Sequence, residues 1–131
     1  MSKAWRPLSF LVIALILAGC ATMSINTITN LTSSRLPRKE SGQYMFSVEF
    51  LTRQRTLIHE TMRVSVVLGT ETFPMSRTPL VTNRWETLVS IPANQDAVNY
   101  FFHFEYDYKA IPTVRQMSRD SELYRLELGD W

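Results

Sequence analysis

Hydrophobic residues recur at every second position over most of this 131-residue chain. Within residues 44–51 and 98–108, large apolar side chains alternate with a second set that is mostly polar. A period of two places one set of side chains on one face of an extended strand. The pattern therefore predicts strands with one buried face, and it argues against a chain built from amphipathic helices.

Seven segments fit such strands, and polar or turn-forming residues separate them. The segments are residues 25–31, 44–51, 61–68, 72–73, 85–91, 98–108 and 124–128, and residues 36–42 are expected to form a loop. A sheet with one apolar face needs a second sheet to cover it. We expect a single all-β domain, an antiparallel β-sandwich of about seven strands over residues 25–131. Its first strand begins near residue 25 or near residue 43.

One corner of the predicted sandwich resembles a known family. Residues 89–92 (Val-Ser-Ile-Pro), a polar loop, and residues 98–102 (Val-Asn-Tyr-Phe-Phe) resemble the E–F corner of immunoglobulin-like and fibronectin-type domains. Residues 28–48 are similar to the A and B strands of early-set immunoglobulin-like domains. The resemblance implies an Ig-like fold in which the Tyr100 hydroxyl bonds the preceding loop. Because a fold does not determine a function, it implies no further site residues.

The N-terminus has the three parts of a secretory signal. Lys3 and Arg6 supply positive charge, residues 8–17 are an apolar run, and Ala18 and Gly19 are small. Ten residues are too few for a spanning helix, which needs about 20. The sequence Leu-Ala-Gly-Cys at residues 17–20 resembles the lipobox of bacterial lipoproteins. An ordinary secretory signal is the alternative.

The lipobox resemblance implies a lipid-anchored protein. Residues 1–19 would be removed, and Cys20 would become a diacylglyceryl thioether at the mature N-terminus, usually with a third acyl chain. Ala21, which stands where aspartate would retain a lipoprotein at the inner membrane, implies the outer membrane of a diderm bacterium. Residues 20–24 would form a tether, and the five residues from Cys20 to Ile25 would span at most about 17 Å.

Charge and cysteine content exclude several classes of function. Lys3 and Arg6 lie in the expected signal, so residues 20–131 carry 12 basic and 12 acidic side chains. A nucleic-acid-binding protein needs a net basic face, so we expect no nucleic-acid partner. Cys20 is the only cysteine. Once it carries lipid, the mature monomer has no thiol for a disulfide, a metal site or a nucleophile.

The other chemistry-bearing residues give weak signals. His59-Glu60 lacks the second histidine of the zinc-protease motif. His103, Glu105 and Asp107 share one face of a strand, with the Cβ atoms of successive members about 7 Å apart. A solvated face explains them better than a metal site. Serines occur outside any Gly-x-Ser-x-Gly elbow. We expect no metal, no cofactor beyond the lipid on Cys20, and no enzymatic activity.

Two kinds of binding surface remain. Several apolar residues fall on the parity opposite the core and are expected to form an exposed partner-binding strip: Leu51, Val67, Leu88, Phe101 and Leu123. This strip favours a structural or accessory subunit of the cell envelope that binds another envelope protein. The alternative is a lipid-tethered carbohydrate-binding module, with rings drawn from Trp85, Tyr106, Tyr108 and Trp131. Trp85 falls on the side of its strand that is expected to face the core, so a buried core tryptophan is favoured over a sugar-binding ring.

Overall fold

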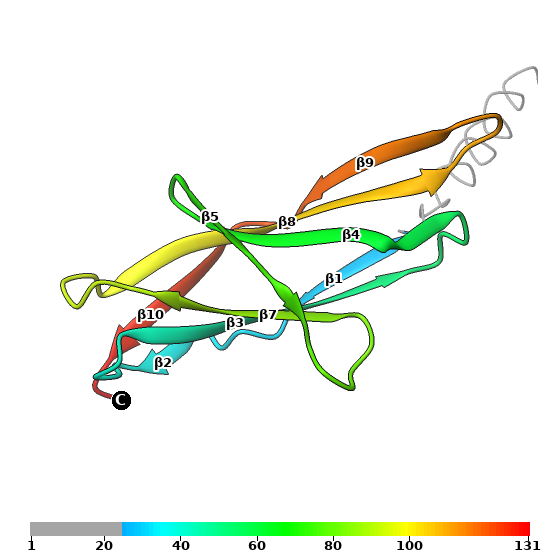
Figure 1. Cartoon of the computed structure of the whole chain (residues 1–131). Helices are drawn as coiled ribbons and strands as arrows, with labels where there is room; N and C mark the ends of the chain where they lie inside the picture. The colour runs from blue at the N-terminus through cyan, green and yellow to red at the C-terminus, as the bar shows by residue number, and fades with distance from the viewer. Residues whose placement is uncertain (1–24) are drawn as a thin grey trace, which may run out of the picture.

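Ten strands make up the part of the chain that the structure, a computed structural model, describes: residues 25–131 (Figure 1). The expected signal, Cys20 and the tether lie outside the described residues. The strands are β1 (Asn26–Asn30), β2 (Arg35–Pro37), β3 (Gln43–Thr52), β4 (Leu57–Leu68), β5 (Glu71–Pro74), β6 (Ser76–Arg77), β7 (Arg84–Ser90), β8 (Ala97–Lys109), β9 (Val114–Asp120) and β10 (Tyr124–Gly129).

The strands form two sheets that face each other. The first sheet has the order β1-β3-β7-β6, and the second has the order β2-β10-β8-β4-β5. All pairs are antiparallel except β2 with β10, which run parallel. The β8 strand is long enough to pair with β10 near its start and with β9 along the rest of the same edge. The β8–β9 hairpin therefore extends beyond β10 (Figure 1).

This topology confirms the predicted all-β, immunoglobulin-like sandwich. The order β1-β3-β7-β6 corresponds to strands A-B-E-D of that fold, and β10-β8-β4-β5 corresponds to G-F-C-C′. Because β1 joins the first sheet and β2 joins the second, the N-terminal segment links both layers. Among the described residues, the first strand begins at Asn26, which decides between the two predicted starts.

Three strands were missing from the prediction. Residues 35–37 form β2 inside a region expected to start a loop, and β6 and β9 are additional edge strands. β2 has three residues and β6 has two, too few for an alternating pattern to be visible. β9 is almost wholly exposed, so neither of its faces shows an apolar stripe.

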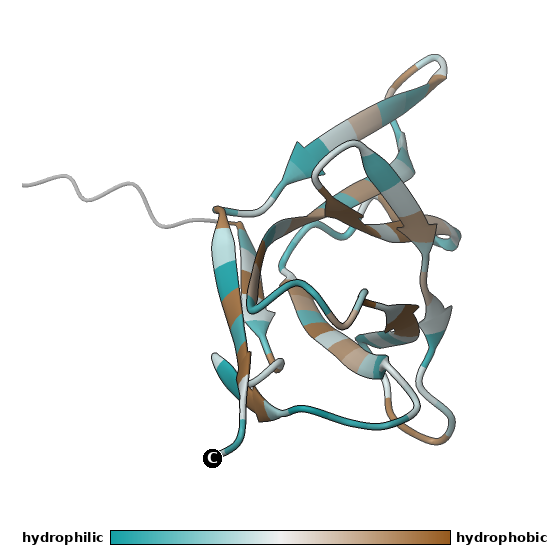
Figure 2. Ribbon diagram, turned by 90° about the vertical axis from the view of Figure 1, so that its left-hand side faces the viewer, coloured by the Kyte–Doolittle hydropathy of each residue, from teal (hydrophilic) through white to brown (hydrophobic). Residues whose placement is uncertain are grey.

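The core lies between the sheets and contains the side chains that the alternation selects. Tyr44, Phe46, Val48 and Phe50 of β3 are all at most 2% exposed, and every second residue of β8 from Tyr100 to Tyr106 is equally buried. Phe46 meets Tyr100 edge to face, with ring centroids 4.8 Å apart. In the view turned by 90°, apolar and polar bands alternate along the strands of both sheets (Figure 2). The fold therefore rests on aromatic packing between β3 and β8.

Asparagine side chains of β1 donate hydrogen bonds to the hydroxyls of two buried tyrosines on β8. Asn30 Nδ2 donates to the Tyr100 hydroxyl at 2.7 Å, and Asn26 Nδ2 donates to the Tyr106 hydroxyl at 3.3 Å. The predicted bond of Tyr100 to the loop before it is therefore wrong. The β1 strand lies at the edge of the first sheet beside β3, and its asparagine side chains reach across to the ring hydroxyls of β8.

Candidate protein-binding face

The outward face of the second sheet carries an apolar group beside its central strand. Val67 of β4 and Phe101 of β8 are cross-strand partners, and both are only partly buried. Ser121 exchanges hydrogen bonds with Phe102 while Tyr124 pairs with Tyr100, so the exposed Leu123 lies beside Phe101. We call Val67, Phe101 and Leu123 the apolar cluster.

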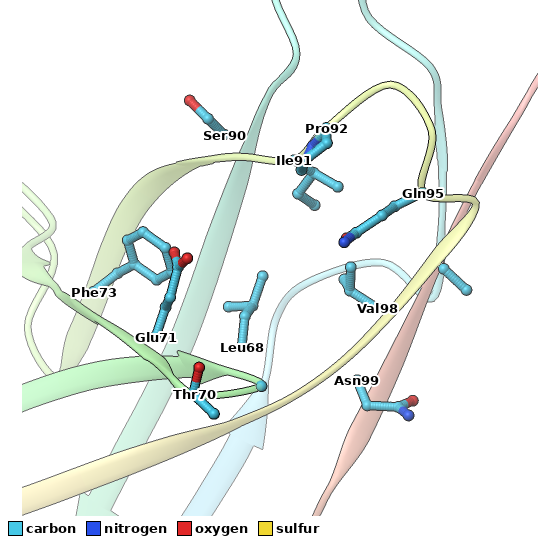
Figure 3. A pocket seen from close by; sticks show the side chains of 12 residues that line it. Leu68, Thr70, Glu71, Phe73, Ser90, Ile91, Pro92, Gln95, Val98 and Asn99 are labelled. Atoms are coloured by element: carbon cyan, nitrogen blue, oxygen red, sulfur yellow. The ribbon is translucent and has the colours of Figure 1, made fainter.

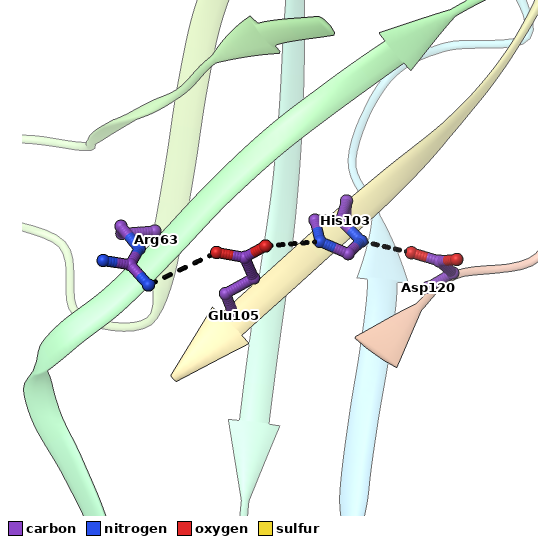
Figure 4. A network of polar contacts seen from close by, with 4 residues as sticks. All are labelled: Arg63, His103, Glu105 and Asp120. Carbon is purple, nitrogen blue, oxygen red and sulfur yellow. Dashed lines mark hydrogen bonds and ion pairs between the residues drawn. The ribbon is translucent and has the colours of Figure 1, made fainter. Parts of the chain in front are cut away.

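A chain of polar contacts continues along the same face (Figure 4). Arg63 Nη2 lies 3.3 Å from Glu105 Oε2, and Glu105 Oε1 lies 3.1 Å from His103 Nε2. The other ring nitrogen of His103, Nδ1, contacts the Asp120 carboxylate on β9. His103 pairs with Ser65 and is two residues from Phe101, so this network borders the apolar cluster.

The network favours the protonated form of His103. The hydrogen bond that the His103 imidazole donates to Asp120 raises the pKa of His103, with a smaller contribution from Glu105, while partial burial opposes the shift. The bond from His103 lowers the pKa of the Glu105 carboxyl, and Arg63 adds to this effect. The face therefore presents an apolar cluster beside alternating charges, which suits contact with a protein surface.

The structure does not bring the five predicted strip residues together. Leu51 and Leu88 point outward from the first sheet, on the opposite side of the molecule from the apolar cluster. The alternation within a strand shows that a side chain points away from the core. It does not show from which sheet it points, and the two sheets have opposite outward faces. Leu88 instead has Met45 as its cross-strand partner, and both are exposed.

Of the three residues predicted to share a face of β8, His103 and Glu105 are paired with each other. Asp107 takes no part in the His103 network, and its backbone N–H donates to the Thr61 hydroxyl at 2.8 Å. Within residues 25–131, no group of three or more His, Cys, Asp or Glu side chains is arranged to hold a metal ion. Both ring nitrogens of His103 are already engaged by carboxylates, so neither is directed at an open site.

The aromatic residues of the carbohydrate alternative do not share a surface. Trp85 is 3% exposed and Tyr106 is fully buried, so neither offers a ring face to solvent. The Arg77 guanidinium stacks 4.9 Å from the Trp85 ring and covers it further. Trp131 is exposed and packs on Gly129 with the Arg35 guanidinium 5.2 Å from its ring. Tyr108 is partly buried in β8.

A hollow of about 580 Å³ opens at one end of the sandwich, between the β4–β5 turn and the β7–β8 loop. Apolar side chains including Leu68, Ile91 and Val98 line it, together with the polar Gln95 (Figure 3). Glu71 is the only titratable side chain in this lining. Ile91 belongs to the core, and Leu68 and Val98 pack against it, so the hollow is the open end of the core.

Two members of the network were missed by the sequence analysis. Asp120 lies on β9, a strand that was not predicted, and nothing in its local sequence links it to His103. Arg63 could have been found, because it falls on the outward parity of its strand as Glu105 does on β8. The missing information was the register, which pairs Arg63 with Glu105.

Comparisons with known proteins show no family to which this chain belongs. No family model matches the chain, and no curated protein matches it. A solved structure titled as murine CRIg is similar over 79% of this chain and 98% of its own, with a TM-score of 0.45 and 11% identity. Within residues 25–131, no helix is long and apolar enough to cross a membrane.

Proposed function

We propose that this chain is a lipid-anchored envelope protein whose sandwich binds another envelope protein through the outward face of the second sheet. The anchor is lipid on the Cys20 thiol, Cys20 is the first residue of the mature protein once residues 1–19 are removed, and the location is the outer membrane. The role is structural or accessory, with no catalytic step and no cofactor besides the lipid.

The observation that carries the binding proposal is the apolar cluster. Phe101 and Val67 are large apolar side chains on the solvent side of a sheet whose other side is the core. Leu123 beside them is 67% exposed. Contiguous apolar surface of this kind, bordered by charged groups, is typical of protein–protein contact sites. Fixed ion pairs along its border add electrostatic selectivity for a complementary partner.

A co-purification experiment tests the proposal. The wild-type protein, the double variant Val67→Ser/Phe101→Ser and the control Met45→Ser/Leu88→Ser would each be recovered from detergent-solubilised envelopes. The control removes two apolar side chains from the outward face of the first sheet, which is the opposite side of the molecule. We expect a stoichiometric protein partner with the wild type and the control, and its loss with the double variant.

The circular dichroism spectrum of each variant shows whether the sandwich is intact. If a folded double variant retains its partner, the proposed face is wrong. If the wild type recovers polysaccharide rather than protein, and the double variant does so equally, the carbohydrate-binding alternative replaces the proposal.

A further inference from the structure

Four exposed cations lie at the end of the sandwich where the described chain begins. The backbone N–H of Arg53 donates to the Ile25 carbonyl at 2.9 Å, so the β3–β4 loop is beside the start of β1. The N–H of Lys109 donates to the Thr56 carbonyl of that loop at 2.8 Å. We call this the basic end, and its exposed cations are Arg53, Arg55, Lys109 and Arg115.

The tip of the β8–β9 hairpin adds apolar side chains to the basic end. Val114 pairs with Lys109 in the hairpin and is 58% exposed, while Ile111 at the turn is fully exposed. Two aliphatic side chains that project together from one loop tip expose apolar surface, which gains free energy on leaving water. The combination of projecting aliphatic groups and surrounding cations is typical of protein segments at a lipid interface.

Charge is distributed unevenly along the molecule. Residues 50–59 and 108–119 contain no acidic side chain, and the nearest acids in the chain beyond them are Glu49, Glu60, Asp107 and Asp120. The opposite end carries the β4–β5 turn, the β7–β8 loop and the C-terminus (Figure 1). Glu40, Glu71, Asp96 and Asp130 there outnumber Arg38 and Lys39. Residues 20–131 are neutral overall, so the basic end is a local feature.

We propose that the basic end is a membrane-contacting surface that binds an anionic phospholipid bilayer. The cations contact the lipid headgroups, and Ile111 and Val114 enter the headgroup layer. The proposal rests on the lipid anchor at Cys20. Ile25 is five positions after Cys20, which corresponds to at most about 17 Å of extended chain. Cations within a Debye length of about 8–10 Å of an anionic surface are attracted to it.

This orientation has a consequence for the binding face. The β8 strand runs from the opposite end toward the basic end, so it stands upright on the bilayer when the basic end makes contact (Figure 1). The apolar cluster then points sideways, parallel to the membrane plane. A partner that binds it is a neighbour in the same membrane rather than a protein approaching from above.

Site-specific fluorescence on the lipidated full chain tests the orientation. Because Cys20 is the only cysteine and would carry lipid, a single cysteine introduced as Thr113→Cys or Thr70→Cys takes one environment-sensitive label. Residue 113 is at the hairpin tip, and residue 70 is in the turn at the opposite end. In vesicles containing an anionic phospholipid, lipid-attached quenchers should quench the label at residue 113 several-fold more than the label at residue 70.

Charge variants test the cause of this orientation. Replacing Arg53, Arg55, Lys109 and Arg115 with glutamine should bring quenching at residue 113 down to the level at residue 70. The matched control replaces four exposed cations elsewhere with glutamine, namely Arg35, Lys39, Arg119 and Arg125, and should retain the difference. Raising the salt from about 0.1 M to about 1 M shortens the Debye length from about 10 Å to about 3 Å and should also reduce the quenching at residue 113.

The outcomes separate this inference from the anchor itself. Thiol labelling of the unmodified chain, or failure to remain on vesicles, would show that Cys20 carries no lipid and would remove the proposed function. An anchored protein with equal quenching at residues 113 and 70, or with quenching unchanged in a folded basic-end variant, would overturn the membrane-contacting surface alone.

Discussion

At the scale of single residues, the Tyr100 hydroxyl links the two layers of the sandwich. It accepts a 2.7 Å hydrogen bond from Asn30 of the first sheet, while its ring packs in the core and burial raises the pKa of the phenol. Tyr100→Phe keeps the ring and removes the bond. We expect a loss of about 1 kcal/mol in the free energy of unfolding, measured with urea.

The control for this change is Tyr108→Phe on the same strand, where the side chain is only partly buried. Its free energy of unfolding should change by less than half of the loss in Tyr100→Phe. Equal losses in the two variants would show that the cross-layer bond contributes nothing specific.

The His103 network makes stability depend on pH in a defined direction. Asp120 first, and Glu105 after it, raise the pKa of His103 in the folded chain above its unfolded value of about 6.5. The stabilisation is therefore complete below the unfolded pKa and is lost as pH rises through the folded pKa. Arg63 shares Glu105, so it remains as a partner for that carboxylate when His103 loses its proton.

His103→Gln tests this sign. The wild type should be more stable than the variant at a pH of about 5.5, which is about one unit below the ordinary imidazole pKa. This advantage should shrink as the pH rises. Urea unfolding of both proteins across this range measures it. An advantage that grows with pH would mean that the folded chain favours the neutral imidazole.

At the scale of elements, β8 carries both the core and the proposed binding face on alternate residues. Phe102 is fully buried, whereas its neighbour Phe101 lies on the outward face. Phe102→Ala should lower the free energy of unfolding by about 3–5 kcal/mol, because it removes a core ring and leaves a cavity. Phe101→Ala should cost much less. Thermal or urea unfolding of the two variants compares them.

Comparable losses in both variants would mean that the outward face of β8 is covered by the protein itself. In that case the apolar cluster would be a second small core, and the proposed binding face would have to be abandoned.

Long strands were predictable from sequence because their alternation is strong. In β3, β4, β7 and β8, the predicted core parity includes Phe46, Val66, Trp85 and Phe104, all of them buried. The short strands β2 and β6 hold their places by pairing with β10 and β7, which is tertiary information. The β9 strand has an exposed sequence and becomes a strand because β8 is long enough to pair with it.

The candidate site was predictable only in part, and the reason is register. Val67, Phe101 and Leu123 were found by parity alone. The structure pairs Val67 with Phe101, and Leu123 lies in the segment opposite Phe101, between Ser121 and Tyr124. Parity also selected Leu51 and Leu88, which face the opposite side. The partners of His103 come from β9 and from its own strand, and the Asp120 contact spans a hairpin whose pairing no sequence pattern specified.

At the scale of the whole molecule, the proposed arrangement has three parts with separate roles. Lipid on Cys20 holds the chain at a bilayer, the basic end with Arg53 and Lys109 contacts the lipid headgroups, and the apolar cluster faces sideways toward a membrane neighbour. Two acyl chains suffice for stable anchoring, so the basic end is expected to set the orientation of the sandwich rather than its membrane residence.

Lipid incorporation at Cys20 is the measurement that tests the account most directly. Cells expressing the wild type or Cys20→Ser would be grown with a labelled fatty acid, and the label on the purified protein would be counted. We predict label on the wild-type chain, a mature N-terminus at Cys20, and no label on Cys20→Ser. An unlabelled wild type, or equal label on both proteins, would contradict the proposed anchor and with it the orientation of the sandwich at the membrane.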